Sequence, residues 1–385
     1  MIEIKEVKTK KDIKKFVNFP HKLYKGNKNF VPFLNIDEIN KFNPKKNESY
    51  HDCIVKCFLA YKDGELVGRI AGIVQKLYNK KVNEKRARFS RFDCIDDNEV
   101  AKALFDAVEK WAKQEGMDIV HGPMGYNDLD REGLLIEGFD QMSTFEEQYN
   151  YDYYGKHIEN NGFEKEVDWV EYRIFAPEEV NERVDKIADV VSKRYNLRLL
   201  TPPSIKWFVD NYKDQFFDVL DAAYSPLYGV VPFSDKMKDS LISQFGLILN
   251  KDFIIGILNE KDELIAFGLV FPSISESVNK SKGRILPFGI FRMLKQIKNP
   301  KSVDLGLIAI RPEYQNKGVN AMIVSHLMHG MIEKKIEYAE TNLMLEDNTR
   351  IQGQWSVFDY IQHKRRRSYV KRIWLYTSNL KFNRK

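Results

Sequence analysis

The chain has 385 residues, and its 61 Lys and Arg against 55 Asp and Glu leave a formal net charge of +6. This length suggests two or three domains, and the small basic surplus argues against a specific DNA-binding protein. Three cysteines exclude a disulfide scaffold and do not cluster with other soft ligands, so no metal site is expected. The sequence has no apolar run near the ~20 residues of a membrane span and no signal peptide at Met1–Glu6, so we expect a cytoplasmic protein.

Hydrophobic periodicity predicts a series of strands and helices in the first half. These are a strand at Ile2–Val7, a helix from about Lys10, a hairpin of Ile54–Tyr61 and Leu66–Gln75, a strand at Ala87–Ile95, a helix from Val100 to Ala112 and a strand at Met117–Val120. The hairpin turn is Asp63-Gly64, a dipeptide that favours tight β-turns.

The second half repeats this order of elements. They are a helix spanning Trp207 to Leu220, a hairpin of Phe253–Leu258 and Leu264–Phe271, a strand at Val303–Ile310, a helix from Val319 to Met331 and a strand at Tyr338–Leu345. The repetition indicates an internal duplication, with one domain at residues 1–175, a boundary at 176–198 and a second domain at 199–385. In the boundary, a charged helix opening at Pro177 is expected to lead into a strand at Leu197–Leu200. We predict an α/β (α+β type) fold, in which each domain is a mixed, mostly antiparallel sheet flanked by helices.

The segment Leu305–Asn320 combines an apolar strand, a turn with Pro312, and a loop whose Gly318 opens directly into a helix. The first N–H groups of a helix have no partners within the helix, and its dipole favours an anion there. Gly318 lets the backbone approach a ligand closely, and Lys317 adds positive charge. The segment therefore predicts a phosphate-binding site.

This segment resembles the pyrophosphate loop of the GNAT superfamily of acyl-CoA N-acyltransferases, in which Arg or Gln is followed by two residues, Gly, one residue, and Gly or Ala. Gln315 and Gly318 match this pattern, while Asn320 stands at its last position. Arg69…Gly72 and Arg350…Gly353 also match the short pattern, but only Gln315…Gly318 follows a strand and opens a long helix. The resemblance covers the whole chain as a tandem GNAT arrangement and is strongest in the last ~85 residues.

The resemblance implies that acetyl-CoA or another acyl-CoA binds to the C-terminal copy. The implied cofactor-binding residues are Ile308, Ile310, Gln315, Asn316, Lys317, Gly318, Val319, Asn320 and Asn348. In the N-terminal copy, Asp96, Asp97 and Glu99 stand where phosphate would lie, and their charge would repel it. We therefore predict that the N-terminal copy is degenerate.

The resemblance implies that the strands expected at Val303–Ile310 and Tyr338–Leu345 separate around the acyl group. Candidate catalytic groups therefore lie on or beside these two strands. Asp304 and Glu346 are candidate bases, together with Glu340. Many GNAT proteins carry a Tyr that protonates the departing thiolate, and the matching position here holds Trp355. Tyr360 is the nearest tyrosine and is the candidate acid.

Two aromatic and polar segments of the first half, Gly122–Asp128 and Gln148–Tyr154, are candidate acceptor sites, or else contacts between the domains. Their candidate substrate-binding residues are Tyr126, Asn127, Tyr153 and Tyr154.

Two basic segments admit more than one interpretation. The run His363–Arg372 is either a solvated strand edge or a contact with a polyanion such as RNA or a phosphate group. The segment Gly283–Lys298 is either an extra helix packed on the sheet or a surface that docks on a membrane or covers a lipid-like chain.

We therefore expect an N-acyltransferase that transfers acetyl to a small-molecule or peptide amine, with the carbonyl polarised by the N–H of Ile310. One alternative is transfer of a longer acyl or an aminoacyl group, as in N-myristoyltransferases and peptidoglycan-building transferases. The other is a catalytically silent CoA-binding module, which Trp355 and Asn320 favour. The acceptor and the oligomeric state are left open.

Overall fold

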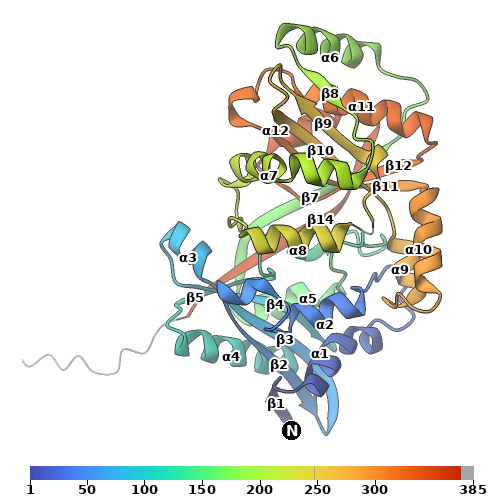
Figure 1. The fold of residues 1–385 in the computed structure, drawn as a ribbon. Helices are drawn as coiled ribbons and strands as arrows, with labels where there is room; N and C mark the ends of the chain where they lie inside the picture. Colours follow the sequence, from blue (N-terminus) through green and yellow to red (C-terminus); the bar gives the residue numbers. More distant parts are fainter. Residues whose placement is uncertain (247, 374–385) are drawn as a thin grey trace, which may run out of the picture.

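The computed structural model describes residues 1–246 and 248–373 (Figure 1). One continuous 14-stranded sheet runs through both halves in the order β1-β2-β3-β4-β5-β14-β7-β12-β11-β10-β9-β8, with β6 paired to β14 and β13 paired to β7. Helices pack on the sheet in each half, and most neighbouring strands are antiparallel. The predicted mixed, mostly antiparallel α/β architecture is confirmed.

The first half contains β1 to β7 and α1 to α5. Their bounds are β1 Ile2–Glu6, α1 Lys10–Leu23, α2 Asn35–Lys41, β2 Cys53–Lys62, β3 Glu65–Gln75, α3 Lys76–Val82, β4 Arg86–Cys94, α4 Asn98–Gln114, β5 Ile119–Gly122, β6 Leu134–Glu137, α5 Tyr153–Asn160 and β7 Glu164–Phe175. Helix α4 has the predicted apolar face, and it buries Leu104, Phe105, Val108 and Trp111 against the sheet.

The second half contains α6 to α12 and β8 to β14. Their bounds are α6 Glu182–Arg194, β8 Arg198–Leu200, α7 Ile205–Tyr224, α8 Asp235–Phe245, β9 Ile254–Leu258, β10 Leu264–Pro272, α9 Ser275–Ser281, α10 Gly289–Lys298, β11 Ser302–Ile310, α11 Asn320–Glu333, β12 Tyr338–Thr341, β13 Met344–Leu345, α12 Thr349–Gly353 and β14 Tyr360–Arg372. None of the helices in the described ranges is both long enough and apolar enough to cross a bilayer.

For two of the expected elements, the structure shows why the boundaries differ from the prediction. Helix α6 begins at Glu182 rather than at Pro177, because the side chain of Asn181 caps it by accepting from the N–H groups of Arg183 and Val184. The strand expected at Tyr338–Leu345 is two strands, β12 and β13, because the chain leaves β11 after Thr341 and continues on β7.

The two halves exchange their last strands. Strand β7 of the first half pairs with β12, whereas β14 at the end of the second half pairs with both β5 and β7. The pair β7–β14 therefore joins the halves at the centre of the sheet (Figure 1).

Both halves contain the same parallel pair of strands. Strands β4 and β5 pair from Arg86↔Ile119 to Arg88↔His121, and β11 and β12 pair from Ser302↔Tyr338 to Leu305↔Thr341. In each half the register of the preceding antiparallel pair shifts at an irregularity, between Arg69 and Ala71 or between Leu269 and Val270. This shared detail supports the duplication that the order of elements predicts.

Candidate acyl-transfer site

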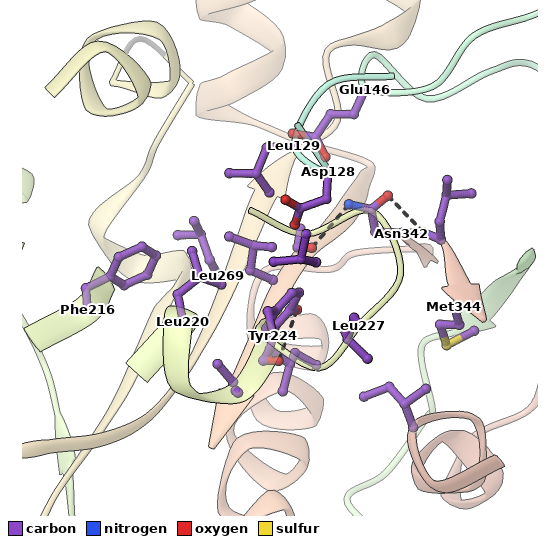
Figure 2. Close-up of a pocket in the computed structure, with 18 of the residues that line it drawn as sticks. Asp128, Leu129, Glu146, Phe216, Leu220, Tyr224, Leu227, Leu269, Asn342 and Met344 are labelled. Atoms are coloured by element: carbon purple, nitrogen blue, oxygen red, sulfur yellow. Dashed lines mark hydrogen bonds between the residues drawn. The ribbon is translucent and has the colours of Figure 1, made fainter. Parts of the chain in front are cut away.

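A cavity of about 550 Å³ opens where β11 and β12 separate (Figure 2). Parallel pairing ends at Leu305↔Thr341, after which β10 is the one described strand that still pairs with β11. The Asn342 side chain lies in the opening, where its amide donates to the Gly306 carbonyl (3.3 Å) and its oxygen accepts from the Leu343 N–H (2.8 Å). Residues 306–310 on one side and 342–345 on the other both line the cavity.

A β-bulge sets the direction of the β11 backbone at this opening. Leu269 pairs with Leu307 and Val270 pairs with Leu305, so Gly306 is the extra residue. A side chain at Gly306 would meet the Phe271 ring at 2.3 Å, so this close packing requires glycine.

Beyond the bulge, the backbone of Ile308 faces the cavity. Its N–H donates to the Tyr224 hydroxyl (3.4 Å), and its carbonyl accepts from the same hydroxyl (3.2 Å). Arg311 donates instead to Ile265 of β10 (2.9 Å). Because peptide groups alternate along a strand, the N–H of Ile310 points to the same side as that of Ile308.

The loop after β11 has the shape that its sequence predicts. A short 3-10 turn at Pro312–Tyr314 is followed by Gln315, whose amide donates to the Ile310 carbonyl (3.0 Å). Asn316 and Gly318 have φ of 60° and 81°, in the left-handed region that favours Asn and Gly. A Cβ on Gly318 would approach Val191 of α6 to 3.0 Å, so the loop lies close to this helix.

The helix that follows this loop presents an unneutralised N-terminus. Within the described residues, no side chain caps α11, whose N-cap residue is Val319, and its first turn holds no acid. In the first half, the Asp97 side chain accepts from the N–H groups of Glu99 and Val100 at the start of α4. The start of α11 therefore suits a phosphate group, while the start of α4 already carries its own anion.

Most of the cavity wall is apolar. Helices α7 and α8, the chain after α8, and strand β10 supply Phe208, Phe216, Phe217, Leu220, Leu241, Ile242, Phe245, Leu249, Leu269 and Phe271. Figure 2 shows Phe216 and Leu220 on one side of the cavity, away from Asp128 and Glu146. The wall thus has an apolar part and an acidic part.

The acidic part comes from the loop between β5 and β6 and from residues 146–147. Burial raises the pKa of Asp128 to about 6, of Glu146 to about 7 and of Glu147 to about 8. Burial, followed by repulsion from Asp128 and Glu147, raises the pKa of Glu132 well above its usual value. Four carboxyl groups at one end of a cavity favour a cationic ligand, because each is poorly solvated and only partly compensated.

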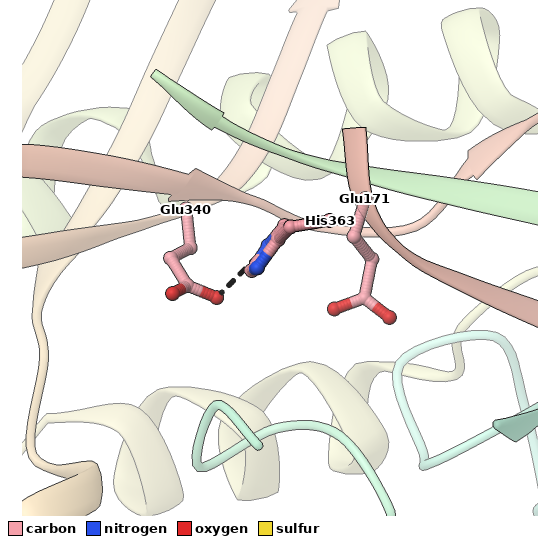
Figure 3. Close-up of side chains that lie close together, drawn as sticks. All are labelled: Glu171, Glu340 and His363. Carbon is pink, nitrogen blue, oxygen red and sulfur yellow. Dashed lines mark ion pairs between the residues drawn. The ribbon is translucent and has the colours of Figure 1, made fainter. Parts of the chain in front are cut away.

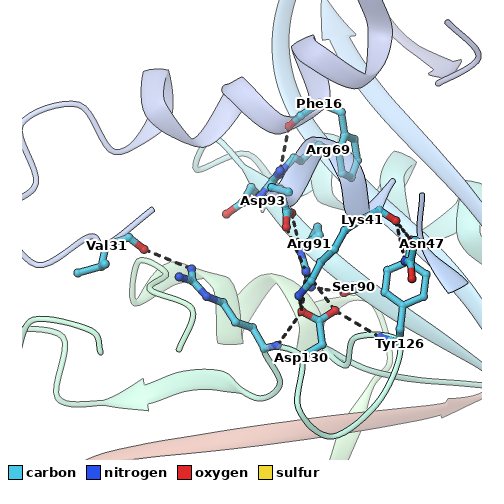
Figure 4. Close-up of polar contacts among 12 residues, drawn as sticks. Phe16, Val31, Lys41, Asn47, Arg69, Ser90, Arg91, Asp93, Tyr126 and Asp130 are labelled. Carbon is cyan, nitrogen blue, oxygen red and sulfur yellow. Dashed lines mark hydrogen bonds and ion pairs between the residues drawn. The ribbon is translucent and has the colours of Figure 1, made fainter. Parts of the chain in front are cut away.

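A buried ion-pair network holds the loop that carries Asp128 (Figure 4). Asp130 accepts from Arg91 (2.8 Å), forms an ion pair with Lys41 and accepts from the N–H of Arg131 (3.0 Å). Burial alone would raise the pKa of Asp130, but the charges of Arg91 and Lys41 outweigh it and lower the pKa. Arg91 also pairs with Glu38 (2.8 Å), so buried charges fill this part of the first half.

The basic run in β14 belongs to a second buried network. Lys364 donates to Glu340 (2.8 Å) and contacts Glu171 at 3.3 Å, while Arg366 donates to Glu171 (2.6 Å). Lys364 and Arg366 are 1% and 0% exposed at the centre of the sheet. Both expectations for His363–Arg372, a solvated edge and a polyanion contact, are therefore wrong for these two side chains, because carboxylates of the neighbouring strands neutralise them.

Glu171, Glu340 and His363 place their ligand atoms within 4.8 Å of one another (Figure 3). The ammonium group of Lys364 lies against both carboxylates and already supplies a cation. Burial and then the charge of Lys364 lower the pKa of His363 to about 4, so its ring is neutral at pH 7. The three residues are accounted for as part of this ion-pair network.

The candidate catalytic residues do not line the cavity. Asp304 is buried on β11, and burial with repulsion from Glu340 raises its pKa well above the usual value. Glu346 accepts from Arg365 (3.0 Å) and pairs with Lys165 on the surface. Tyr360 is 42% exposed and stacks on Tyr172.

Most of the implied cofactor-binding residues do line it. Ile308, Ile310, Gln315, Asn316, Asn320 and Asn348 form part of its wall. Lys317 lies over the rings of Tyr195 and Tyr314, Gly318 lies against α6, and the side chain of Val319 is buried in the core.

The candidate substrate-binding residues lie outside the cavity wall. Tyr126 is buried and donates to the Lys41 carbonyl (3.0 Å), and the Asn127 side chain accepts from the N–H of Leu129 (3.0 Å). Tyr153 donates to the Cys94 carbonyl (2.8 Å), and Tyr154 lies 2.9 Å from the Tyr24 hydroxyl in the first-half core. The loop after β5, which contains Tyr126 and Asn127, does contribute to the cavity wall. The residues that it contributes there are Asp128, Leu129 and Asp130.

Sequence reasoning missed Tyr224 and Asp128. Tyr224 ends α7, and burial raises its pKa to about 12, so it remains a proton donor at neutral pH. Asp128 directly follows the loop residues that were singled out. The sequence did contain a signal for an acidic site here, because three of the six residues of Asn127–Glu132 are acidic.

Two curated proteins resemble this chain over most of their length. Protein YghO of Escherichia coli (strain K12) is 28% identical over 376 residues, covering 94% of each chain. A protein named bacterial ceramide synthase, from Caulobacter vibrioides (strain NA1000 / CB15N), is 24% identical over 330 residues, covering 84% of each. No protein-family model matches the chain.

Solved structures share the fold at low identity. A tandem GNAT protein from the clavulanic acid biosynthesis pathway matches with a TM-score of 0.54 and 9% identity, covering 97% of this chain and 98% of that one. A GCN5-related glucosamine N-acetyltransferase region of a fungal multi-domain β-N-acetylglucosaminidase matches with a TM-score of 0.56 and 10% identity, covering 96% of this chain and 38% of that one.

Proposed function

Because the chain has the tandem GNAT fold, we propose that it is an acyltransferase that moves a long acyl chain from acyl-CoA to an amine. One observation carries the proposal: the opening between β11 and β12 leads into a single cavity with an apolar wall and an acidic wall. An acyl chain fits the first wall and a protonated amine fits the second.

In this proposal, the acyl donor CoA binds at the loop from Gln315 to Asn320. The uncapped start of α11 and the left-handed backbone at Gly318 suit the pyrophosphate of CoA. The rest of that molecule would run along Ile308 and Ile310 towards the apolar wall. Arg350, which also lines the cavity, adds a positive charge to its wall.

The wall supports a longer acyl group than acetyl. Burial of each methylene contributes about 0.8 kcal/mol, and an acetyl group offers one methyl to a wall built from large apolar side chains. The relative named bacterial ceramide synthase is consistent with N-acylation by a longer chain. Acetyl transfer stays a prediction that the same experiment tests.

The acceptor would enter as a cation. Asp128, Glu132, Glu146 and Glu147 form a buried cluster of carboxyl groups with raised pKa values, and an ammonium group bound beside them would favour their ionised form, which a neutral hydroxyl would not. Of these, Asp128 has a pKa of about 6, which leaves it mostly ionised at neutral pH and able to accept a proton.

The proposed reaction uses groups that already face the cavity. Asp128 takes a proton from the ammonium, and the amine nitrogen attacks the thioester carbonyl. The backbone N–H of Ile310, which points to the same side of β11 as that of Ile308, stabilises the negative oxygen. The C–S bond then breaks while the C–N bond remains. Tyr224 gives its hydroxyl proton to the departing sulfur and takes up the second proton of the nitrogen, so the products are the amide and CoA thiol. Tyr224 thus performs the task of the tyrosine that many GNAT proteins carry at the position where this chain has Trp355.

Release of CoA thiol should be measured with acyl-CoAs from acetyl to palmitoyl and with a panel of long-chain and short polar amines. We expect kcat/KM to rise with acyl length and the amide product to appear by mass spectrometry. Tyr224→Phe should lower kcat, whereas Tyr360→Phe, which changes an exposed tyrosine in the same way, should not.

A fastest reaction with acetyl-CoA would refute the long-chain part of the proposal and favour acetyl transfer. Tight CoA binding without turnover of any amine would refute catalysis and favour the silent module.

A further inference from the structure

An exposed apolar patch lies on α10 and the segment that leads into it, at the edge of the molecule (Figure 1). Leu286, Phe288, Phe291 and Leu294 form this α10 patch and are 74%, 69%, 68% and 49% exposed. Four large apolar side chains within nine residues are unusual for a solvated surface, and grouped exposure of this kind marks an interaction site.

Basic side chains surround the α10 patch. Lys282, Arg284, Arg292, Lys295 and Lys298 are all exposed, and residues 281–298 contain no Asp or Glu. Within the described part of the chain, none of these five residues forms an ion pair. The rim of the patch is therefore positively charged and unneutralised.

The other face of α10 is anchored to the protein. Met293 is buried with Phe271 and Ile274 in one core cluster, against which Ile285 and Ile297 pack. The Gly283 carbonyl accepts from the N–H of Asn35 (3.0 Å), which ties the segment to the first half. The α10 patch is thus a supported surface rather than a loose end.

The same core cluster reaches the acyl-transfer cavity. Phe245, Leu249, Leu269 and Phe271 belong to it or pack against it, and each also lines the cavity. The helix that presents the α10 patch therefore packs on the outer side of the apolar cavity wall.

We propose that the α10 patch docks the protein on the surface of an anionic membrane. Apolar side chains with a basic rim are the combination that an interfacial helix uses, since the rings enter the headgroup boundary and the cations meet anionic lipid. A partner with an acidic rim would satisfy only the charges, and a second copy of this chain would bring like charges together at the rim.

Flotation of the full chain with vesicles tests this proposal. Vesicles of phosphatidylcholine alone are compared with vesicles that also contain phosphatidylglycerol. We expect binding to the mixed vesicles that is at least about tenfold stronger than to the neutral ones, and that falls steeply in about 1 M NaCl.

Two double variants separate the apolar and the ionic contributions. Phe288→Ser with Phe291→Ser, and Arg292→Glu with Lys295→Glu, should each lower the vesicle partition coefficient at least about tenfold. Ile187→Ser with Val190→Ser is the matched apolar control, because these side chains are 41% and 62% exposed on α6, whose charges are mixed. Lys11→Glu with Lys14→Glu on α1 is the matched charge control.

The controls should bind vesicles like the original chain, and thermal unfolding should show that all four variants are folded. The proposal is overturned if the original chain does not bind mixed vesicles, or if the α10 variants bind as well as the controls. It is also overturned if light scattering finds a dimer that the Phe288/Phe291 variant dissociates, because a second copy would then cover the patch.

Discussion

Replacement of Asp128 by Asn should slow the reaction and stabilise the fold at the same time. Burial raises the pKa of this carboxyl from 3.8 to about 6 in the folded protein. Each pKa unit corresponds to about 1.4 kcal/mol, so ionised Asp128 costs the folded state about 3 kcal/mol. Residues that lower stability are expected at sites that need a perturbed acid or base.

The sign of this effect follows from proton binding. Between pH 3.8 and about 6, the folded protein holds a proton on Asp128 that the unfolded chain has released. The cost is therefore absent below pH 3.8 and complete above about pH 6. Asp128→Asn removes the charge, and its free energy of unfolding at pH 8 should exceed that of the original chain by up to about 3 kcal/mol.

The kinetic effect has the opposite direction. Only ionised Asp128 accepts the proton, so kcat/KM of the original chain should fall as the pH drops through about 6. Loss of a general base lowers the rate about 100-fold or more, and Asp128→Asn should also lose the acidic limb of the profile.

The assay combines urea unfolding at pH 5 and pH 8 with a pH profile of CoA release. Asp304→Asn is the matched variant, because Asp304 is also a carboxyl group whose pKa is raised by burial but lies outside the cavity wall. The Asp304→Asn protein should keep the fall of kcat/KM at low pH. An Asp128→Asn protein with normal kcat/KM, or one that unfolds more easily at pH 8, would refute this reasoning.

Three further predictions concern the proposed CoA-binding loop Gln315–Asn320, the apolar wall and the central ion pairs. Asn320→Glu should raise the dissociation constant of CoA at least about tenfold in calorimetry without loss of stability, because an acid stabilises a helix start but repels phosphate. Asn320→Gln should leave this dissociation constant nearly unchanged. Leu269→Trp should shift the preferred acyl-CoA to shorter chains, with each excluded methylene costing about 0.8 kcal/mol, or roughly fourfold in kcat/KM; an unchanged preference would place the chain elsewhere. Lys364→Met should lower the free energy of unfolding by about 3–5 kcal/mol, because Glu171 and Glu340 lose a buried partner; a loss below about 1 kcal/mol would contradict the network.

Local signals in the sequence were sufficient for the architecture and for the strand, loop and helix at residues 302–333. The helix and strand periods, the hairpin at Asp63-Gly64 and the repeated order of elements predict two mixed, mostly antiparallel halves, which the sheet contains. The loop at Gln315–Gly318 was predictable because glycine, a preceding strand and a following helix are all neighbours in sequence. Contacts between residues close in sequence leave their pattern in the sequence itself.

Only the tertiary structure decided which acids and tyrosines meet the cavity. Tyr224 reaches Ile308 across 84 positions of sequence, and Asp128 arrives from the other half. The basic run of β14 is buried because β14 inserts between β5 and β7, and its pairing with Glu171 and Glu340 depends on that insertion. Sequence spacing carries no record of such long-range pairings, and a charge run has the same composition on a solvated edge as at the centre of a sheet.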